Sequence, residues 1–412
     1  MDTKRITQHT VLVYLGISML IVFTVFSCTK SEKDTVPDDL LKRQASVVNH
    51  FTIGLEDQGE EYQLGSPIGV RTDSELNIYI ADRASMTIKV FDSTGVYIRE
   101  FGGRGRGPGE FLDMNTFEIT PEEDFFVLDR GRWRYTFVDN QGEQISSESF
   151  SFEPMGNFFP HDVDFYEDKT IGLDVSATNE VELFPIFERP LFHIYDRTLS
   201  KKDTSFFKFK ELQEIEINRF TFVMFIGRQG SFVVNKAKDR FYYSPYLYHR
   251  NLYVFKKDRE HWKLDGVRKL TDFGLKSFTK TTVQENKDLR SKNVSGLVVM
   301  RFGFPEPHTG RVNTFDMGLY ELSDGRLISF VGKWRDDLSK ERDHEFVIDI
   351  YAQTYDTESK EVRFLGLVQS VEADMNHFKP LINWKDKEDN FYLLNNNGIS
   401  IPSVIKFSIE GL

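Results

Sequence analysis

The chain has 412 residues, of which 40% are hydrophobic, 28% charged and 14% aromatic. This balance is typical of a folded globular chain and excludes a disordered or fibrous protein. The formal net charge of −12 disfavours nucleic-acid binding, because phosphate recognition needs clustered Lys and Arg side chains. We therefore expect no nucleic-acid partner.

Residues 1–27 have the pattern of a secretory signal peptide. Two basic residues precede an apolar stretch from Val11 to Phe26, which is short for a membrane-spanning helix. The stretch ends in the sequence VFSC, which resembles a bacterial lipobox, and Cys28 is the predicted lipid-attachment residue. The alternative is an uncleaved membrane anchor with an incidental cysteine.

Cys28 is the only cysteine of the chain, so the processed protein would have no disulfide and no free thiol. Thiolate catalysis and cysteine-based zinc sites are excluded with it. Residues 28–45 are polar and charged, as expected of a flexible tether between a lipid and a folded domain. The predicted location is the outer membrane of a Gram-negative bacterium, with the lipid-anchored protein periplasmic or exposed on the cell surface.

The segment from Ser46 to Leu55 is apolar enough to form a strand, and an internal repeat follows it. Residues 78–95 match residues 125–142 without gaps at an offset of 47, with Asp82 recurring as Asp129. Each copy is predicted to form strand, loop, strand, turn and strand. Because one antiparallel meander cannot bury both its faces, such a repeat favours a radial array of sheets.

The first copy resembles an NHL repeat. The resemblance rests on residues 77–92, the sequence NIYIADRASMTIKVFD, and on the connection GPGEF at residues 107–111. The whole chain is similar to six-bladed β-propeller lipoproteins of bacteria. This resemblance implies a fold and carries no particular reaction with it.

The glycine-rich run from Gly102 to Gly109 does not fit a phosphate-binding loop. Pro108 and a strand-like stretch follow, where a nucleotide-binding motif needs a helix. We interpret the run as a crossover between two blades.

Arginines follow the repeated aspartates. Arg83 and Arg130 stand at equivalent positions of the two copies, and Arg132 and Trp133 lie beside Arg130. Two interpretations stay open. The side chains form a cationic, aromatic ligand-binding patch for a carboxylate or sugar acid, or each arginine pairs with a neighbouring aspartate and braces its loop.

Asp162 and Asp164 are predicted to lie on one face of a strand, where two carboxylates could bind a hard cation such as calcium. The competing interpretation is that they are ordinary surface or turn residues. The histidines of the chain have no metal-ligand spacing, and we expect no other cofactor.

Four fainter copies of the pattern bring the count to six, centred near residues 85, 132, 182, 247, 338 and 398. Residues 267–298 form an insertion between the fourth and fifth copies. Its polar part, residues 280–293, is predicted to carry a short helix, in either a lid or a solvated excursion.

The predicted fold is all-β, with residues 46–412 forming a six-bladed β-propeller of four-stranded antiparallel blades, closed by the N-terminal strand. The predicted function is a monomeric, membrane-anchored binding module for a glycan, a peptide or an envelope protein, without enzymatic activity. The alternative is a metal-assisted lactonase, hydrolase or lyase at the central channel. Acidic, Asn or His side chains from different blades that converge on one point of the channel axis with metal-like spacing would favour the enzyme, whereas an apolar and aromatic lining would favour binding.

Overall fold

The computed structural model describes residues 38–149, 159–175, 188, 190–213, 230–274, 276–292, 294–300, 307–335, 346–373, 381–396 and 400–412. Residues 39–412 form one compact unit. The predicted signal peptide lies outside the described residues, as do residues 28–37 of the predicted tether, Cys28 among them. Residues 39–45 of that segment belong to the folded unit, because the Ala45 backbone N–H donates to the Leu367 carbonyl at 2.9 Å and the Leu367 N–H donates to the Arg43 carbonyl at 2.8 Å. Among the helices of the described part, none is long and apolar enough to cross a membrane.

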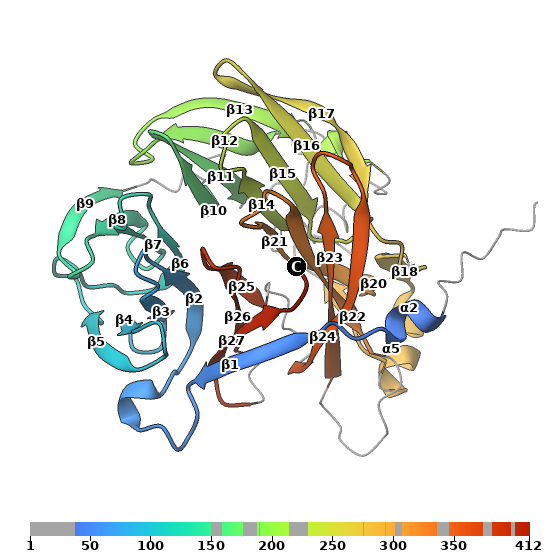
Figure 1. Ribbon diagram of the computed structural model, residues 1–412, viewed down its shortest axis with the longest axis horizontal. Coiled ribbons are helices and arrows are strands. Elements are labelled where there is room, and N and C mark those ends of the chain that lie inside the picture. Colours follow the sequence, from blue (N-terminus) through green and yellow to red (C-terminus); the bar gives the residue numbers. More distant parts are fainter. Residues whose placement is uncertain are drawn as a thin grey trace, which may run out of the picture. The chain divides into compact units, whose positions relative to one another are not determined.

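Six four-stranded antiparallel sheets form the predicted blades (Figure 1). Blade 1 contains β2 (Pro67–Thr72), β3 (Ile78–Asp82), β4 (Thr87–Phe91) and β5 (Tyr97–Gly102). Blade 2 contains β6 (Met114–Ile119), β7 (Phe125–Asp129), β8 (Arg134–Val138) and β9 (Gln144–Ser149). Blade 3 contains β10 (Phe159–Tyr166), β11 (Lys169–Val175), β12 (Pro190–Asp196) and β13 (Lys202–Lys208).

Blade 4 contains β14 (Gly230–Val234), β15 (Arg240–Pro245), β16 (Asn251–Asp258) and β17 (His261–Lys269). Blade 5 contains β21 (Thr314–Glu321), β22 (Leu327–Trp334), β23 (Phe346–Tyr355) and β24 (Val362–Ala373). Blade 6 contains β25 (Ile382–Lys385), β26 (Phe391–Asn395) and β27 (Ser403–Ile409), with β1 (Val47–Ile53) as its fourth strand. The six sheets coincide with the six predicted copies.

The innermost strands of the blades close a ring. Strand β2 contacts β6, and the contacts continue through β10, β14, β21 and β25 back to β2. The N-terminal strand β1 pairs antiparallel with β27, with Val48 opposite Ser408 and Ile53 opposite Val404. This pairing confirms the predicted ring closure, because the first strand of the unit covers an edge that β27 would otherwise expose.

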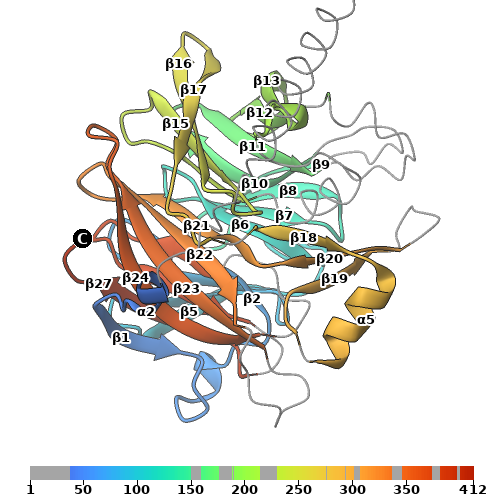
Figure 2. The same cartoon turned by 90° about the vertical axis from the view of Figure 1, so that its right-hand side faces the viewer.

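The insertion between blades 4 and 5 is more ordered than predicted. Strands β18 (Phe278–Thr281), β20 (His308–Val312) and β19 (Leu297–Met300) form a three-stranded sheet in that order. The predicted helix is α5 (Val283–Ser291), which begins with a capping box between Thr282 and Glu285 and contacts β19 and β20 (Figure 2). Three other short helical segments are present in the described residues: α2 (Asp38–Lys42), η1 (Glu60–Tyr62) and η2 (Phe209–Glu211).

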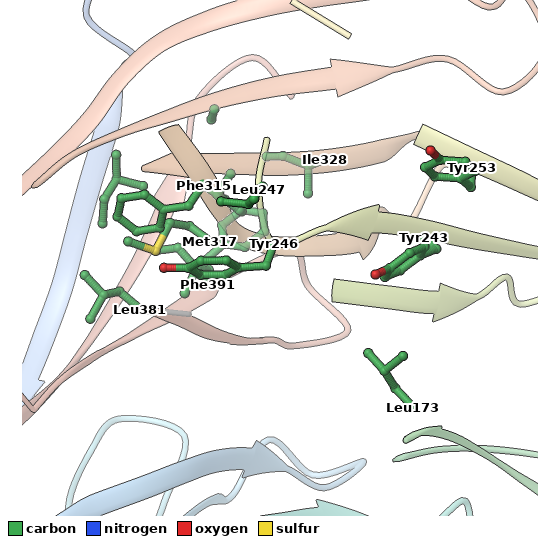
Figure 3. Packing of buried hydrophobic residues seen from close by; sticks show 14 of the residues in the cluster. Leu173, Tyr243, Tyr246, Leu247, Tyr253, Phe315, Met317, Ile328, Leu381 and Phe391 are labelled. Atoms are coloured by element: carbon green, nitrogen blue, oxygen red, sulfur yellow. The ribbon is translucent and has the colours of Figure 1, made fainter. Parts of the chain in front are cut away.

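The core lies between neighbouring blades. Tyr79 of blade 1 and Phe125 of blade 2 have ring centroids 4.5 Å apart, within a cluster that both blades supply. Similar clusters join blades 6 and 1, 2 and 3, and 4 and 5, and the largest runs from blade 3 to blade 6. Figure 3 shows part of this last cluster, where Tyr246, Phe315 and Phe391 approach one another from three blades. Since a blade is buried on both faces, its second strand reads as a continuous apolar run, as in β3 and β7.

Candidate functional site

The channel inside the ring contains a cavity of about 440 Å³. The innermost strands of all six blades line it, mainly through the residues nearest their C-terminal ends. Its charged and aromatic lining side chains include Arg71, Glu118, Asp162, Asp164, Tyr320 and Trp384. The volume falls within the range of sites for small ligands, and the lining is polar enough to orient one.

Four of these side chains occupy one level of the channel. Arg71, Glu118, Tyr320 and Trp384 each stand two residues before a turn of the same geometry. In each turn, the backbone N–H of the first residue donates to the carbonyl four residues later, at 2.7–3.2 Å. Equivalent positions in four blades therefore present two opposite charges and two aromatic rings to the same space.

Arg71 is the centre of a network that joins three blades. Its guanidinium forms a two-point ion pair with Glu118, with Nη2 donating to Oε2 at 2.6 Å and Nε donating to Oε1. Its Nη1 donates to Asn383 Oδ1 at 3.1 Å, and its Cζ lies 4.8 Å from the centre of the Trp384 ring. Trp384 Nε1 in turn donates to Thr72 Oγ1 at 2.9 Å.

The electrostatics of this pair keep Arg71 positively charged. Burial acts to lower the pKa of Arg71, but the charge of Glu118 and the hydrogen bonds to it outweigh burial and raise the pKa above its ordinary value. Both side chains are only slightly exposed, at 12% for Arg71 and 14% for Glu118. Glu118 is therefore committed to Arg71 and has little capacity left to hold another cation.

Asp162 and Asp164 both line the cavity, on the wall that β10 supplies. Burial raises the pKa of the Asp164 carboxyl to about 7, although the Val234 backbone N–H donates to it at 3.2 Å. By solvent exposure Asp164 is half-buried and Asp162 is exposed, and both border the cavity. Within the described residues, no group of three or more His, Cys, Asp or Glu side chains is placed to hold a metal ion.

A second buried carboxylate lies beside the channel. Asp316 on β21 is fully buried and accepts a hydrogen bond at 2.6 Å from the hydroxyl of Ser231, which lines the cavity. Burial raises the pKa of Asp316 to about 7, and the hydrogen bond from Ser231 opposes part of that effect.

The predicted arginine patch lies on other loops. Arg83 Nη2 is 2.6 Å from Asp113 Oδ1, in the crossover that leads into blade 2, as the bracing interpretation expects. Arg132 Nη1 donates to the carbonyl of Glu110 at 3.2 Å. Arg130 is exposed and its backbone N–H donates to the Asp113 carbonyl, while Trp133 is 37% exposed with a φ of 52°. None of these four residues lines the cavity.

The repeated aspartates hold these loops in place. Asp82 accepts three backbone hydrogen bonds at 2.7–2.9 Å, from Gly65, Ser66 and Ala84. Asp129 accepts three at 2.9–3.1 Å, from Leu112, Asp113 and Gly131. Every partner of the second set lies 47 residues after its counterpart, so the repeat in the sequence is also a repeat of hydrogen bonds.

Comparison with protein families places the fold in a known group. A family model, DUF5128, described as a 6-bladed beta-propeller, matches residues 59–295, which is more than half of the chain. The chain belongs to this family. Among curated proteins, no sequence matches it.

Solved structures share the DUF5128 chain's fold at low sequence identity. A member of the DUF4221 family from Bacteroides vulgatus has a TM-score of 0.53 and 11% identity, covering 89% of this chain and 99% of that one. A structure described as an exported protein from Bacteroides fragilis has a TM-score of 0.48 and 11% identity, covering 88% of this chain and 95% of that one. Virginiamycin B lyase from Staphylococcus aureus has a TM-score of 0.41 and 7% identity, covering 87% and 98%. At 11% identity, the similarity to the DUF4221 structure shows the fold alone.

Sequence reasoning found Asp162 and Asp164 but missed Arg71, Glu118 and Trp384. One signal was available, since Arg71 and Glu118 are separated by the same offset of 47 that relates the two repeats. Opposite charges at one repeat position predict a pair between neighbouring blades. Trp384 stands at the equivalent position of blade 6, where Asp73, Asn77 and Tyr79 recur as Asp386, Asn390 and Tyr392 at an offset of 313, but an uncharged ring does not by itself predict its partner.

Proposed function

We propose that this DUF5128 protein is a binding module of the bacterial cell envelope, with the central cavity as its ligand site. One observation carries the proposal: a cavity of about 440 Å³ is lined by all six blades and presents charges, hydroxyls, an amide and three aromatic rings. Such a surface suits a ligand rich in hydrogen-bonding groups, such as a small glycan or a peptide segment.

The cavity favours binding because most of its charged groups are already oriented by the protein. Arg71 and Glu118 hold each other, Lys236 Nζ donates to the Leu322 carbonyl at 3.1 Å, and Lys385 Nζ donates to Asp389 at 2.7 Å. Side chains fixed in this way lose little conformational entropy when a ligand binds. Asp164 and Asp162 add hydrogen-bond acceptors on the β10 wall.

The second candidate is a hydrolase or lyase, and Asp164 is the observation that favours it. A carboxyl with a pKa raised to about 7 can both accept and release a proton near neutral pH, as general acid–base catalysis requires. Under this hypothesis the lyase or hydrolase would use the same cavity. The two candidates differ in what the Asp164 carboxyl does for the ligand.

The experiment is a screen of neutral and charged oligosaccharides and peptides against the wild type and the Asp162→Asn, Asp164→Asn double variant. For a binding module, we expect a ligand that the double variant binds about tenfold or more weakly, and no turnover. The matched control, Glu148→Gln with Glu358→Gln, changes two exposed carboxylates outside the cavity and should bind as the wild type does. Equal binding by the double variant and the wild type would contradict the cavity as the site.

If the protein is an enzyme, the Asp164→Asn variant should still bind the ligand but no longer convert it to product. Mass spectrometry of the ligand after incubation distinguishes this outcome from simple binding.

The proposed location is the outer membrane, to which a lipid on Cys28 would anchor the protein. It is supported by the signal-peptide pattern of residues 1–27 and the lipobox-like sequence VFSC. Residues 28–37 would then connect the membrane surface to the folded unit. The protein would act as a monomer that presents its cavity to envelope ligands.

A further inference from the structure

Several arginines lie on neighbouring loops of blades 1 and 2, away from the cavity. Arg83 lies in the loop after β3, Arg104 and Arg106 lie in the crossover after β5, and Arg130 and Arg132 lie in the loop after β7. We propose that this arginine face, defined by these five residues and Arg134, is a second binding site whose ligand is an acidic polysaccharide that presents carboxylate groups.

Contacts between the loops bring the arginines together. Arg104 donates from Nη2 to the Ala84 carbonyl at 3.4 Å and from Nη1 to the Leu112 carbonyl at 3.5 Å, so its guanidinium bridges the loop after β3 and the crossover. Arg132 donates to the Glu110 carbonyl at 3.2 Å, which ties the loop after β7 to the same crossover. The three loops therefore form one continuous surface.

The acidic groups inside this surface are already engaged. Asp82 and Asp129 are buried and accept backbone hydrogen bonds. Asp113 pairs with Arg83, and Glu110 Oε2 accepts the Gly107 backbone N–H at 2.7 Å. Local carboxylates consequently neutralise only part of the arginine charge.

Three of the guanidinium groups are available for a ligand. In the described part of the chain, the side chains of Arg106, Arg130 and Arg134 have no hydrogen-bond or ion-pair partner, and Arg106 and Arg130 are exposed. An anion bound on these loops would interact favourably with each of these positive charges. A guanidinium offers two parallel N–H groups, which match the two oxygens of a carboxylate.

The sequence repeat places arginines of this site at equivalent positions of adjacent blades. Arg83 and Arg130 stand at equivalent positions of adjacent blades, with the backbone N–H of each donating to Ser66 or Asp113 at 2.9 and 3.0 Å. A polymer with acidic groups at intervals can contact both blades, whereas a single small anion contacts one. The net charge of −12 repels a polyanion more strongly the denser its charge, so a glycan with spaced carboxylates is repelled less than a nucleic acid or an anionic membrane.

The test measures binding of hexagalacturonate and of neutral maltohexaose by isothermal titration calorimetry, with the wild type and with Arg106→Ala, Arg130→Ala. We expect the wild type to bind hexagalacturonate and not maltohexaose, with affinity falling as ionic strength rises. The double variant should bind at least about tenfold more weakly. Its melting temperature should match that of the wild type, because neither side chain has a partner to lose.

The control variant is Arg259→Ala with Arg290→Ala, which removes two exposed arginines far along the chain at the turn after β16 and at the end of α5. It changes the net charge by the same amount and should bind hexagalacturonate as the wild type does. Three outcomes would overturn the proposal: no binding by the wild type, equal binding by both double variants, or a single-stranded DNA oligonucleotide or phosphatidylglycerol vesicles bound more tightly than hexagalacturonate through the same two arginines. If hexagalacturonate does not bind, the result expected from the screen of cavity ligands stays the same. Each of the two proposals can therefore fail without the other.

Discussion

Arg71 and Glu118 occupy the same position of the 47-residue repeat in adjacent blades and form a two-point ion pair with each other across the blade boundary. A position that carried the same charge in both copies would place like charges side by side in the channel. The divergence of the two copies at this position therefore both joins blades 1 and 2 and sets the polarity of the cavity.

The pair should be strongly coupled. Arg71→Met and Glu118→Gln are each expected to lower the free energy of unfolding by about 3 kcal/mol. Each substitution leaves the partner's charge unpaired in a place that solvent barely reaches. The double variant should lose less than the sum of the two, since the second change removes the stranded charge. Urea denaturation of the four proteins measures the coupling. Strictly additive losses would contradict it.

The repeated aspartates should be required for stability. Asp82→Ala and Asp129→Ala each leave three backbone N–H groups without their acceptor, at a cost of about 1–3 kcal/mol for a buried polar group. Asp92, which accepts hydrogen bonds in an exposed turn, provides the control, and Asp92→Ala should cost less. Thermal denaturation followed by circular dichroism makes the comparison. Equal losses at all three positions would argue against this role of the buried Asp82 and Asp129.

The carboxyl of Asp164 predicts a pH dependence of stability. Its pKa is raised from 3.8 to about 7, so between these values the folded protein keeps a proton that the unfolded chain has released. The free energy of unfolding should therefore decrease as pH rises through this window and level off above about 7. Asp164→Asn should be more stable than the wild type above that pH, with the difference vanishing in acid.

Asp92 supplies a control of opposite sign. The hydrogen bond from Thr94 holds the pKa of Asp92 below its ordinary value, so Asp92 stabilises the folded protein once ionised and loses that effect as the pH falls. Asp92→Asn should thus be less stable than the wild type at neutral pH. If Asp164→Asn instead follows the wild type at every pH, the carboxyl is not buried as described.

The register between β1 and β27 can be tested by cross-linking. Val48 faces Ser408 in the antiparallel ladder, so Val48→Cys with Ser408→Cys, in a Cys28→Ser background, should form a disulfide that raises the melting temperature until it is reduced. Val48→Cys with Glu410→Cys is displaced by two residues and should not. Efficient cross-linking of the displaced pair would mean a different register.

Lipid attachment is tested at Cys28. Labelled fatty acid should enter the wild-type protein in a Gram-negative host and not Cys28→Ser, and the variant should leave the membrane fraction. Equal labelling of the two proteins would contradict the proposed lipid anchor. Digestion by protease added to intact cells would place the protein on the outer surface.

The sequence was sufficient to predict the six blades, the closing strand and the helix in the insertion, because these depend on local patterns. A run such as Ile78–Asp82, followed by a polar loop and a turn, specifies a strand and its neighbours whatever surrounds it. The offset of 47 then predicts a ring, since equal units stack in equal ways.

The candidate site depended on tertiary structure, because its residues come from strands far apart in the chain. Arg71 meets Asn383 and Trp384 only after β2 and β25 have closed the ring, and nothing near Arg71 in the sequence indicates either partner. The same is true of the Asp164 proton affinity, which depends on burial by other blades. Local sequence specifies which strands form, whereas long-range packing specifies which side chains share a solvent-poor space, and the chemistry of the cavity follows from that packing.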